Sequence, residues 1–138
     1  MADSRYFKVK IISPDRVFYE GEADLLELKT SEGDIGILAG HIPLTAIIAP
    51  GVMKITKDGE VKEGALLEGF VEILQDRVTV LAEACEWPDE IDMNRAKEAK
   101  IRAERRLSER DAEINYTRAE NALKKALVRL EIGEKYGK

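Results

Sequence analysis

The stretch SEGDIGILAGHIPLTAIIAPG, residues 31–51, decides the fold, because short apolar runs alternate there with glycines and prolines. The glycines offer positions that can take a positive φ, and the prolines fix φ and lack an amide donor. This pattern predicts a strand, an exposed corner and a second strand. The corner carries the only histidine of the chain, His41, and an exposed loop of this kind presents groups for chemistry or for a partner protein. The punctuating residues are Gly33, Gly36, Gly40, Pro43 and Pro50.

Short strands are predicted on both sides of this stretch, because apolar residues alternate with a period of two. The pair Asp58-Gly59 tolerates the positive φ angles of a tight hairpin turn and gives the clearest local signal. Regularly spaced short strands favour a sandwich or a barrel, and we expect an all-β sandwich of about ten short strands over residues 1–86. The strands expected are residues 6–12, 17–19, 26–30, 35–38, 42–49, 52–57, 61–63, 70–75 and 78–81.

Near Pro88 the apolar period changes from two to 3.6, which predicts a C-terminal helical domain of two helices at residues 87–138. Asp92 is a good N-cap candidate for the first helix. Many seam positions are alanines, which allow close approach but bury little area, so we expect a weakly held helical hairpin. The first helix has its stripe at Met93, Ala96, Ala99 or Lys100, Ala103 and Leu107, and the second at Ala112, Tyr116, Ala119, Leu123, Ala126 and Leu130.

The segment between the two stripes contains no glycine or proline that compels the chain to turn, although Ser108 and Asp111 are candidate caps. The same residues therefore suit a folded hairpin or one helical arm of about 40 residues, roughly 60 Å long. We take the helical domain to be a bistable element as a hypothesis, with a permanently closed hairpin as the alternative.

Charge is divided unevenly along the chain. Residues 1–88 hold 9 Lys and Arg against 16 Asp and Glu, whereas residues 89–138 hold 13 against 11. The acidic first part argues against nucleic-acid binding, which needs a basic surface. The mildly basic second part suits an acidic partner.

Cysteine and histidine occur once each, as Cys85 and His41, which leaves no internal disulfide and no metal cluster. We expect Cys85 to be buried and inert. The sequence has no phosphate-binding Gly-rich loop and no serine-hydrolase motif, so no enzyme is predicted. The longest largely apolar run, residues 44–52, is shorter than the ~20 residues that cross a bilayer, and the start lacks an apolar signal core, so we expect no membrane span and no export.

Four motifs together resemble the epsilon subunit of F-type ATP synthase: SEGDIGILAGHIPL at 31–44, GVMKI at 51–55, VTVLAEA at 78–84 and IDMNRA at 91–96. The resemblance covers about residues 7–132. It implies a non-catalytic subunit of the rotating central stalk, which couples ion-driven or proton-driven rotation to ATP synthesis and inhibits ATP hydrolysis. The implied partners are the gamma subunit, the ring of c-subunits and the alpha and beta subunits. The implied location is peripheral, on the cytoplasmic face of a bacterial plasma membrane.

The resemblance also implies contact residues. Asp34 and His41 match loop positions at which the sandwich of the family meets gamma and the c-ring; the alternatives are a turn former and a histidine that satisfies local backbone groups. Basic residues of the helices match an arm that engages an acidic segment of beta, and the alternative is a solvated face with i,i+4 pairs such as Glu98–Arg102. These basic residues are Arg102, Arg105, Arg106 and Lys124, with Lys125 and Arg129.

Some bacterial members of the family bind ATP on the folded hairpin, through an Ile/Leu-Asp-x-x-Arg-Ala pattern that this chain meets at Asp92 and Arg95. The resemblance adds Glu86 before it and the basic pair Lys125 and Arg129. Cations at i and i+4 share a helix face and suit phosphates, whereas the carboxylates can accept from base or ribose. Lys125 is a point charge where tight binders carry the planar fork of arginine. The alternative is Asp92 as an N-cap only, with Arg95 pairing beside it.

No cofactor is required by this interpretation, and ATP enters only as a regulatory ligand. The rival interpretation is a coiled-coil adaptor with a β-sandwich head and no nucleotide binding.

Overall fold

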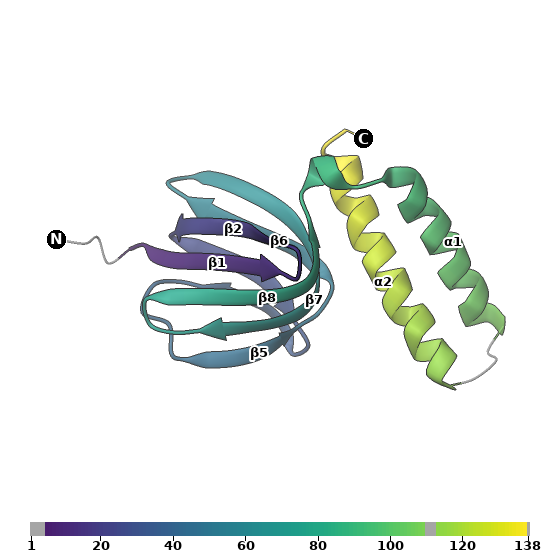
Figure 1. Cartoon of the computed structure of the whole chain (residues 1–138), viewed down its shortest axis with the longest axis horizontal. Helices are drawn as coiled ribbons and strands as arrows, with labels where there is room; N and C mark the ends of the chain where they lie inside the picture. Colours follow the sequence, from purple (N-terminus) through teal and green to yellow (C-terminus); the bar gives the residue numbers. More distant parts are fainter. Residues whose placement is uncertain (1–4, 110–112, 138) are drawn as a thin grey trace. The chain divides into compact units, whose positions relative to one another are not determined.

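The structure is a computed structural model, and it describes residues 5–109 and 113–137. Over these residues the chain forms eight strands, a short 3-10 helix and two α-helices (Figure 1). The chain divides into two compact units between Cys85 and Glu86, and each is described by itself. The elements are β1 (Phe7–Ser13), β2 (Arg16–Ala23), β3 (Leu25–Thr30), β4 (Gly33–Ile37), β5 (Leu44–Ile48), β6 (Gly51–Lys57), β7 (Glu60–Ile73), β8 (Arg77–Glu86), η1 (Pro88–Glu90), α1 (Met93–Glu109) and α2 (Glu113–Lys135).

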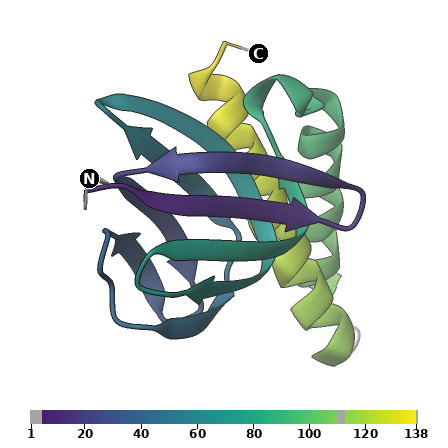
Figure 2. The same ribbon diagram turned by 60° about the vertical axis from the view of Figure 1, so that its left-hand side comes forward.

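The strands follow the order β2-β1-β8-β7-β5-β3-β4, and β6 pairs with both β3 and β7. The β1 and β8 strands pair in parallel, whereas β1–β2, β3–β4, β5–β7 and β6–β7 are antiparallel. Figures 1 and 2 show the sheet folding over on itself into two layers, as in a β-sandwich. The first strand is thus held by the last, so the unit closes through contacts between residues far apart in sequence.

Alternation along each strand fills the space between the layers. In β1, Phe7, Val9 and Ile11 are buried, whereas Lys8 and Lys10 are exposed, as the sequence predicts. The core is built mainly from aliphatic side chains, and Phe7 and Phe18 are its buried aromatic residues. Its largest fully buried members in this unit are Val9, Ile11, Leu26, Ile37, Met53, Ile55, Leu66, Leu67, Val71, Ile73 and Val78.

The turn between β6 and β7 confirms the hairpin predicted at Asp58-Gly59, where both residues have positive φ (51° and 85°). The prediction of two separate strands at 61–63 and 70–75 is wrong, because β7 runs through them without a break. The first half of β7 pairs with β6 and the second half with β5, which lets one strand serve both neighbours. Gly69 makes this possible: at its φ of +142°, a Cβ would lie 2.0 Å from the Leu81 carbonyl oxygen. The sandwich therefore has eight described strands rather than about ten.

The second unit consists of η1 and two helices that lie side by side (Figures 1 and 2). The α1 seam is confirmed by buried Ala96 and Ala103, and the α2 seam by buried Ala119 and Ala126. Tyr116 was expected in the α2 seam but is 46% exposed. An α-helix drifts about 20° per heptad from a 3.5-residue repeat, and the tyrosine hydroxyl prefers water. Ala112 and Asp111 lie outside the described residues.

Helix α1 ends at Glu109 and α2 begins at Glu113, so the structure holds the helices in the folded hairpin and not in one extended arm. Among the described residues, no helix combines the length and hydropathy that a bilayer span requires.

Candidate functional site

A small polar pocket lies in the helical unit. It has a volume of about 190 Å³. The end of β8, η1, α1 and α2 all contribute, so the folded hairpin brings together residues more than 40 positions apart. The lining residues are Glu86, Glu90, Asp92, Arg95, Ala96, Ala99, Arg102 and Arg129.

Arg129 and Glu86 make the main polar contact of this pocket. The Arg129 Nε and Nη2 atoms donate to the two Glu86 carboxylate oxygens at 2.8 and 3.2 Å. Both side chains are only about a quarter exposed (26% and 29%). A bidentate, half-buried pair of this kind is stronger than an exposed ion pair, and here it fastens α2 to the segment that precedes α1.

Asp92 lies at the start of α1 and caps it. Its Oδ1 accepts from the Arg95 backbone N–H at 3.1 Å, and its carbonyl accepts from Ala96 at 3.0 Å. An aspartate in this position satisfies an amide that has no partner within the helix and complements the helix dipole. The N-cap role expected as one alternative is thus confirmed, and the same carboxylate also lines the pocket.

The charges of the pocket are balanced. Three arginines face it, Arg95, Arg102 and Arg129, together with three carboxylates. The planar guanidinium groups of arginine match phosphate oxygens, and carboxylates accept hydrogen bonds from amino or hydroxyl groups. The pocket therefore suits a ligand that carries a phosphate together with amino or hydroxyl groups. Because Glu86 already neutralises Arg129, an incoming anion competes with that pair.

Two of the predicted assignments differ from what the structure brings together. Lys125 is half-buried one turn before Arg129 but is not among the residues that line the pocket. Arg102, expected among the partner contacts, does line it, while its side chain also pairs with Glu98 at 3.9 Å. Spacing could have revealed Arg102, because residues seven apart, such as Arg95 and Arg102, share a helix face. Glu90 was missed as well, since nothing in its local sequence marks it.

The remaining basic residues expected as partner contacts, Arg105, Arg106 and Lys124, are exposed on the helices. Lys124 pairs with Glu120 at 3.7 Å, one helical turn away. Such exposed pairs contribute only about 0.3–0.5 kcal/mol each and leave the charges accessible.

The corner, residues 38–43 between β4 and β5, is an apolar surface of the sandwich. Leu38, Ile42 and, in the adjoining strand, Ile47 are 61%, 79% and 66% exposed. Exposed aliphatic side chains that lie near one another along the chain make this region a candidate interaction surface. His41 lies among them, and its Nδ1–H donates to the Ile42 carbonyl at 2.6 Å, which is the local backbone contact expected as the alternative to a partner role.

Two details of this region correct the sequence interpretation. Asp34 is not a turn residue, because it lies within β4 and pairs with Lys29 of β3. Gly33 and Gly40 have positive φ as expected, but Gly36 does not, since it continues the extended strand.

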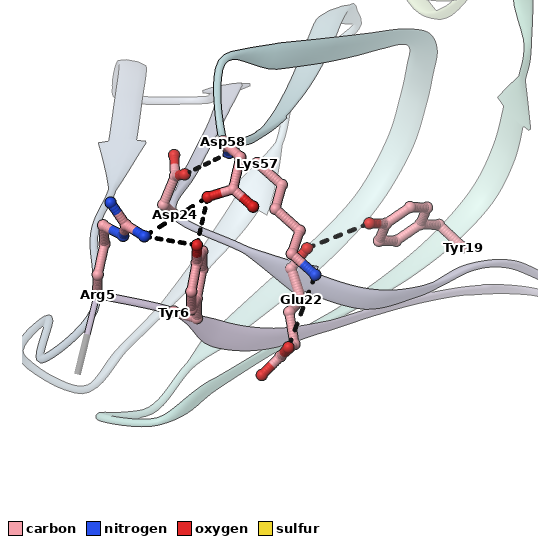
Figure 3. A network of polar contacts seen from close by, with 7 residues as sticks. All are labelled: Arg5, Tyr6, Tyr19, Glu22, Asp24, Lys57 and Asp58. Atoms are coloured by element: carbon pink, nitrogen blue, oxygen red, sulfur yellow. Dashed lines mark hydrogen bonds and ion pairs between the residues drawn. The ribbon is translucent and has the colours of Figure 1, made fainter. Parts of the chain in front are cut away.

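A second polar cluster joins the start of the chain to the β6–β7 turn (Figure 3). Tyr6 donates to the Asp58 carboxylate and accepts from Arg5 at 2.6 Å, and the Asp58 backbone N–H donates to Asp24 at 2.8 Å. The hydrogen bond to Asp58 raises the pKa of Tyr6. Every group here is matched by another within the sandwich, so the cluster ties strands together. The other residues drawn are Tyr19, Glu22 and Lys57.

Among residues 5–109 and 113–137, no three His, Cys, Asp or Glu side chains are placed so that they could hold a metal ion. Cys85 is buried, as predicted.

The architecture defines a class of two-unit proteins, in which a β-sandwich is followed by a helical hairpin. The family described as "ATP synthase, Delta/Epsilon chain, beta-sandwich domain" matches residues 6–88, and "ATP synthase, Delta/Epsilon chain, long alpha-helix domain" matches residues 89–134. The chain belongs to the ATP synthase delta/epsilon chain family. As the resemblance implied, it is therefore a non-catalytic subunit of ATP synthase.

Named relatives are similar in sequence to this protein over nearly the whole chain. An ATP synthase epsilon chain of Caldanaerobacter subterraneus is 47% identical over 94% of this chain and 95% of its own length. One from Halalkalibacterium halodurans is 45% identical, covering 90% and 94%.

Solved structures support the fold. A chain in a Euglena gracilis mitochondrial ATP synthase matches with a TM-score of 0.79 at 22% identity, covering 92% of this chain and 80% of that one. A chain in the central stalk and c-ring structure of the Tetrahymena thermophila enzyme matches with a TM-score of 0.70 at 16% identity, covering 92% and 96%.

Proposed function

We propose that this subunit couples rotation of an ion-driven rotor to ATP synthesis and restrains ATP hydrolysis through its helical hairpin, whose folded state is stabilised by bound ATP. The observation that carries the regulatory part is the pocket, since Glu86, Asp92, Arg95 and Arg129 converge on it only when the hairpin is folded. A ligand that binds this state alone shifts the equilibrium toward it by its binding free energy.

The pocket holds part of a nucleotide rather than all of it. Ordinary small-molecule sites have volumes of about 300–1,000 Å³, and this one is about 190 Å³. With Arg129 already paired and a lysine at position 125, we expect weak binding that responds to millimolar ATP. This range would let the subunit respond to a fall in cellular ATP.

The sandwich supplies the docking end. The exposed aliphatics of the corner, with His41 and Asp34, fit contact with the gamma subunit and the ring of c-subunits. The structures of similar fold include rotor assemblies that contain a c-ring. With these partners, we expect the subunit to be a peripheral protein at the cytoplasmic face of a bacterial membrane.

The basic exposed residues Arg105, Arg106 and Lys124 fit an acidic surface of the catalytic head formed by alpha and beta. In the extended arm these residues would be free to engage it, whereas the folded hairpin holds them back. Inhibition that weakens as salt is raised is the expected signature, because exposed charges are screened.

Isothermal titration of the full chain with ATP tests the nucleotide proposal. We expect binding to the wild type and about tenfold weaker binding by Arg95→Ala, because a charged hydrogen-bond donor in the pocket is lost. Arg106→Ala is the matched control, since it removes the same side chain from an exposed position outside the pocket. Absence of heat at millimolar ATP would overturn the proposal and leave the folded hairpin without a nucleotide.

A further inference from the structure

Gly133 occupies an unusual position in α2. It is buried in the last turn of α2, which ends at Lys135, and glycine is among the least favourable residues in a helix. A Cβ at this position would lie 2.0 Å from the Met93 Sδ atom, 2.9 Å from Cε and 3.2 Å from Cγ. The Met93 side chain therefore lies directly against the α2 backbone at Gly133, where only a hydrogen atom fits.

The contact lies beside the pocket in both helices. Met93 is the first residue of α1 and falls between Asp92, which caps the helix, and Arg95. Gly133 follows Arg129 by four residues, which is one helical turn on the same face. The distance between Met93 and Gly133 therefore sets how near Arg129 comes to the α1 side of the pocket.

We propose that Met93 and Gly133 form the packing contact that fixes the closed hairpin and positions Arg129 against Glu86. A side chain at position 133 that the thioether cannot avoid separates the end of α2 from the start of α1 and withdraws Arg129. The effect on hairpin closure stands alone, whereas the effect on nucleotide binding rests on the function proposed above.

The two residues form a knob and a hole. Methionine is unbranched and adaptable, so Gly133→Ala is met in part by movement of the Met93 side chain. Gly133→Leu adds a side chain of about the size of methionine, which that movement cannot absorb. Met93→Ala combined with Gly133→Leu exchanges knob and hole between the helices and should restore closure.

Helix propensity does not explain such a result. Position 133 is helical in the folded hairpin and in an extended arm, so replacing glycine favours both states equally. At position 133, the contact with Met93 is the difference between the two states on which this proposal rests.

The test measures the distance between spin labels at Lys97 and Glu131, both exposed, in the full chain without nucleotide. Buried Cys85 is first replaced by alanine. We expect one closed population for the wild type, a ratio of closed to open forms lowered by at least about tenfold in Gly133→Leu, and a ratio within about twofold of the wild type in the double variant.

Glu134→Leu is the matched control, because it places the same side chain at the neighbouring exposed position and should leave the ratio unchanged. A Gly133→Leu variant as closed as the wild type overturns the proposal. A double variant that stays open or fails to fold also overturns the proposal, because moving the large side chain from position 93 to position 133 then does not restore the closed hairpin.

ATP titration separates this inference from the proposed function. If the wild type binds no ATP, the proposed function fails and the label distances still decide the packing proposal. If Gly133→Leu is open yet binds ATP as tightly as the wild type, Gly133 does not position the pocket.

Discussion

The sandwich and the hairpin are held together by different kinds of side chain. Among the described residues, eleven of the largest fully buried side chains belong to the sandwich, all of them branched aliphatics or methionine, and only Ile132 belongs to the hairpin. The buried seam of the hairpin consists largely of Ala96, Ala103, Ala119 and Ala126. Since hydrophobic stabilisation scales with apolar area removed from water, the sandwich has much more to lose on opening than the hairpin.

Connectivity sharpens the difference. In the sandwich, β1 pairs with β8 about 70 residues away, so the first strand cannot leave without breaking its pairing with the last. In the hairpin, each helix satisfies its own backbone hydrogen bonds, and separation of the helices breaks none of them. The sandwich is thus built to stay closed, whereas the hairpin is held by a weak seam with a few specific contacts.

The largest expected effect is on stability, and it tests whether the sandwich core carries most of the folding free energy. Leu67→Ala removes a fully buried side chain and should lower the free energy of unfolding by about 2–5 kcal/mol, through lost apolar burial and the cavity that remains. Denaturant unfolding followed by fluorescence of the intact chain measures the loss.

Leu81→Ala is the matched control for this prediction. It makes the same change in a strand, at a side chain that is 41% exposed, and should cost less than about 1 kcal/mol. Equal losses at the two positions would show that the sandwich core does not carry the stability assigned to it.

The sequence predicts the parts of the molecule that local patterns determine. Alternation reveals the buried face of β1, Asp58-Gly59 reveals a hairpin turn, and Asp92 reveals the start of α1. Each of these signals depends on a few residues that are close together in sequence. Their physical cause is local, so the residues alone are sufficient.

The parts that escape prediction depend on distant contacts. The sequence pattern predicts separate strands at 61–63 and 70–75, but pairing of β7 with β6 and then with β5 carries one strand through both. Likewise, Arg129 and Glu86 are 43 residues apart, and their bidentate geometry exists only in the folded hairpin. The resemblance to a family indicated Glu86, Asp92, Arg95 and Arg129, together with Lys125, which does not line the pocket. Helical spacing from Arg95 could have added Arg102, whereas Glu90 emerges only from the packed helices.

A smaller effect separates the two roles of Asp92 in the hairpin. Asp92→Ala removes the N-cap of α1 and should destabilise its first turn by about 1 kcal/mol. The Arg95 amide donates to Asp92 in the wild type. Its hydrogen exchange should become about fivefold faster in Asp92→Ala, which is the factor that a loss of about 1 kcal/mol implies.

Asp92→Asn keeps a good capping side chain and removes the charge, so exchange at Arg95 should stay near the wild-type rate. If ATP affinity falls in Asp92→Asn while exchange does not change, the carboxylate acts on the ligand as well as on the helix. Fast exchange in Asp92→Asn would instead show that the charge, through the helix dipole, stabilises the first turn.

The smallest effect concerns the edge of the sandwich and its dependence on pH. The hydrogen bond to Asp58 raises the pKa of Tyr6 above its ordinary value of 10.0, so the folded state retains the phenol proton to higher pH than the unfolded chain. The contribution of the Tyr6–Asp58 hydrogen bond to the free energy of unfolding is therefore fully present below pH 10, and it is lost as the pH rises through the pKa of Tyr6 in the folded state. Tyr6→Phe removes the titrating group, and its unfolding midpoint should fall less steeply above pH 10 than that of the wild type. Because Tyr6 lies at the surface, the difference between the two slopes should be small, and parallel curves would show that its bond to Asp58 does not persist in solution.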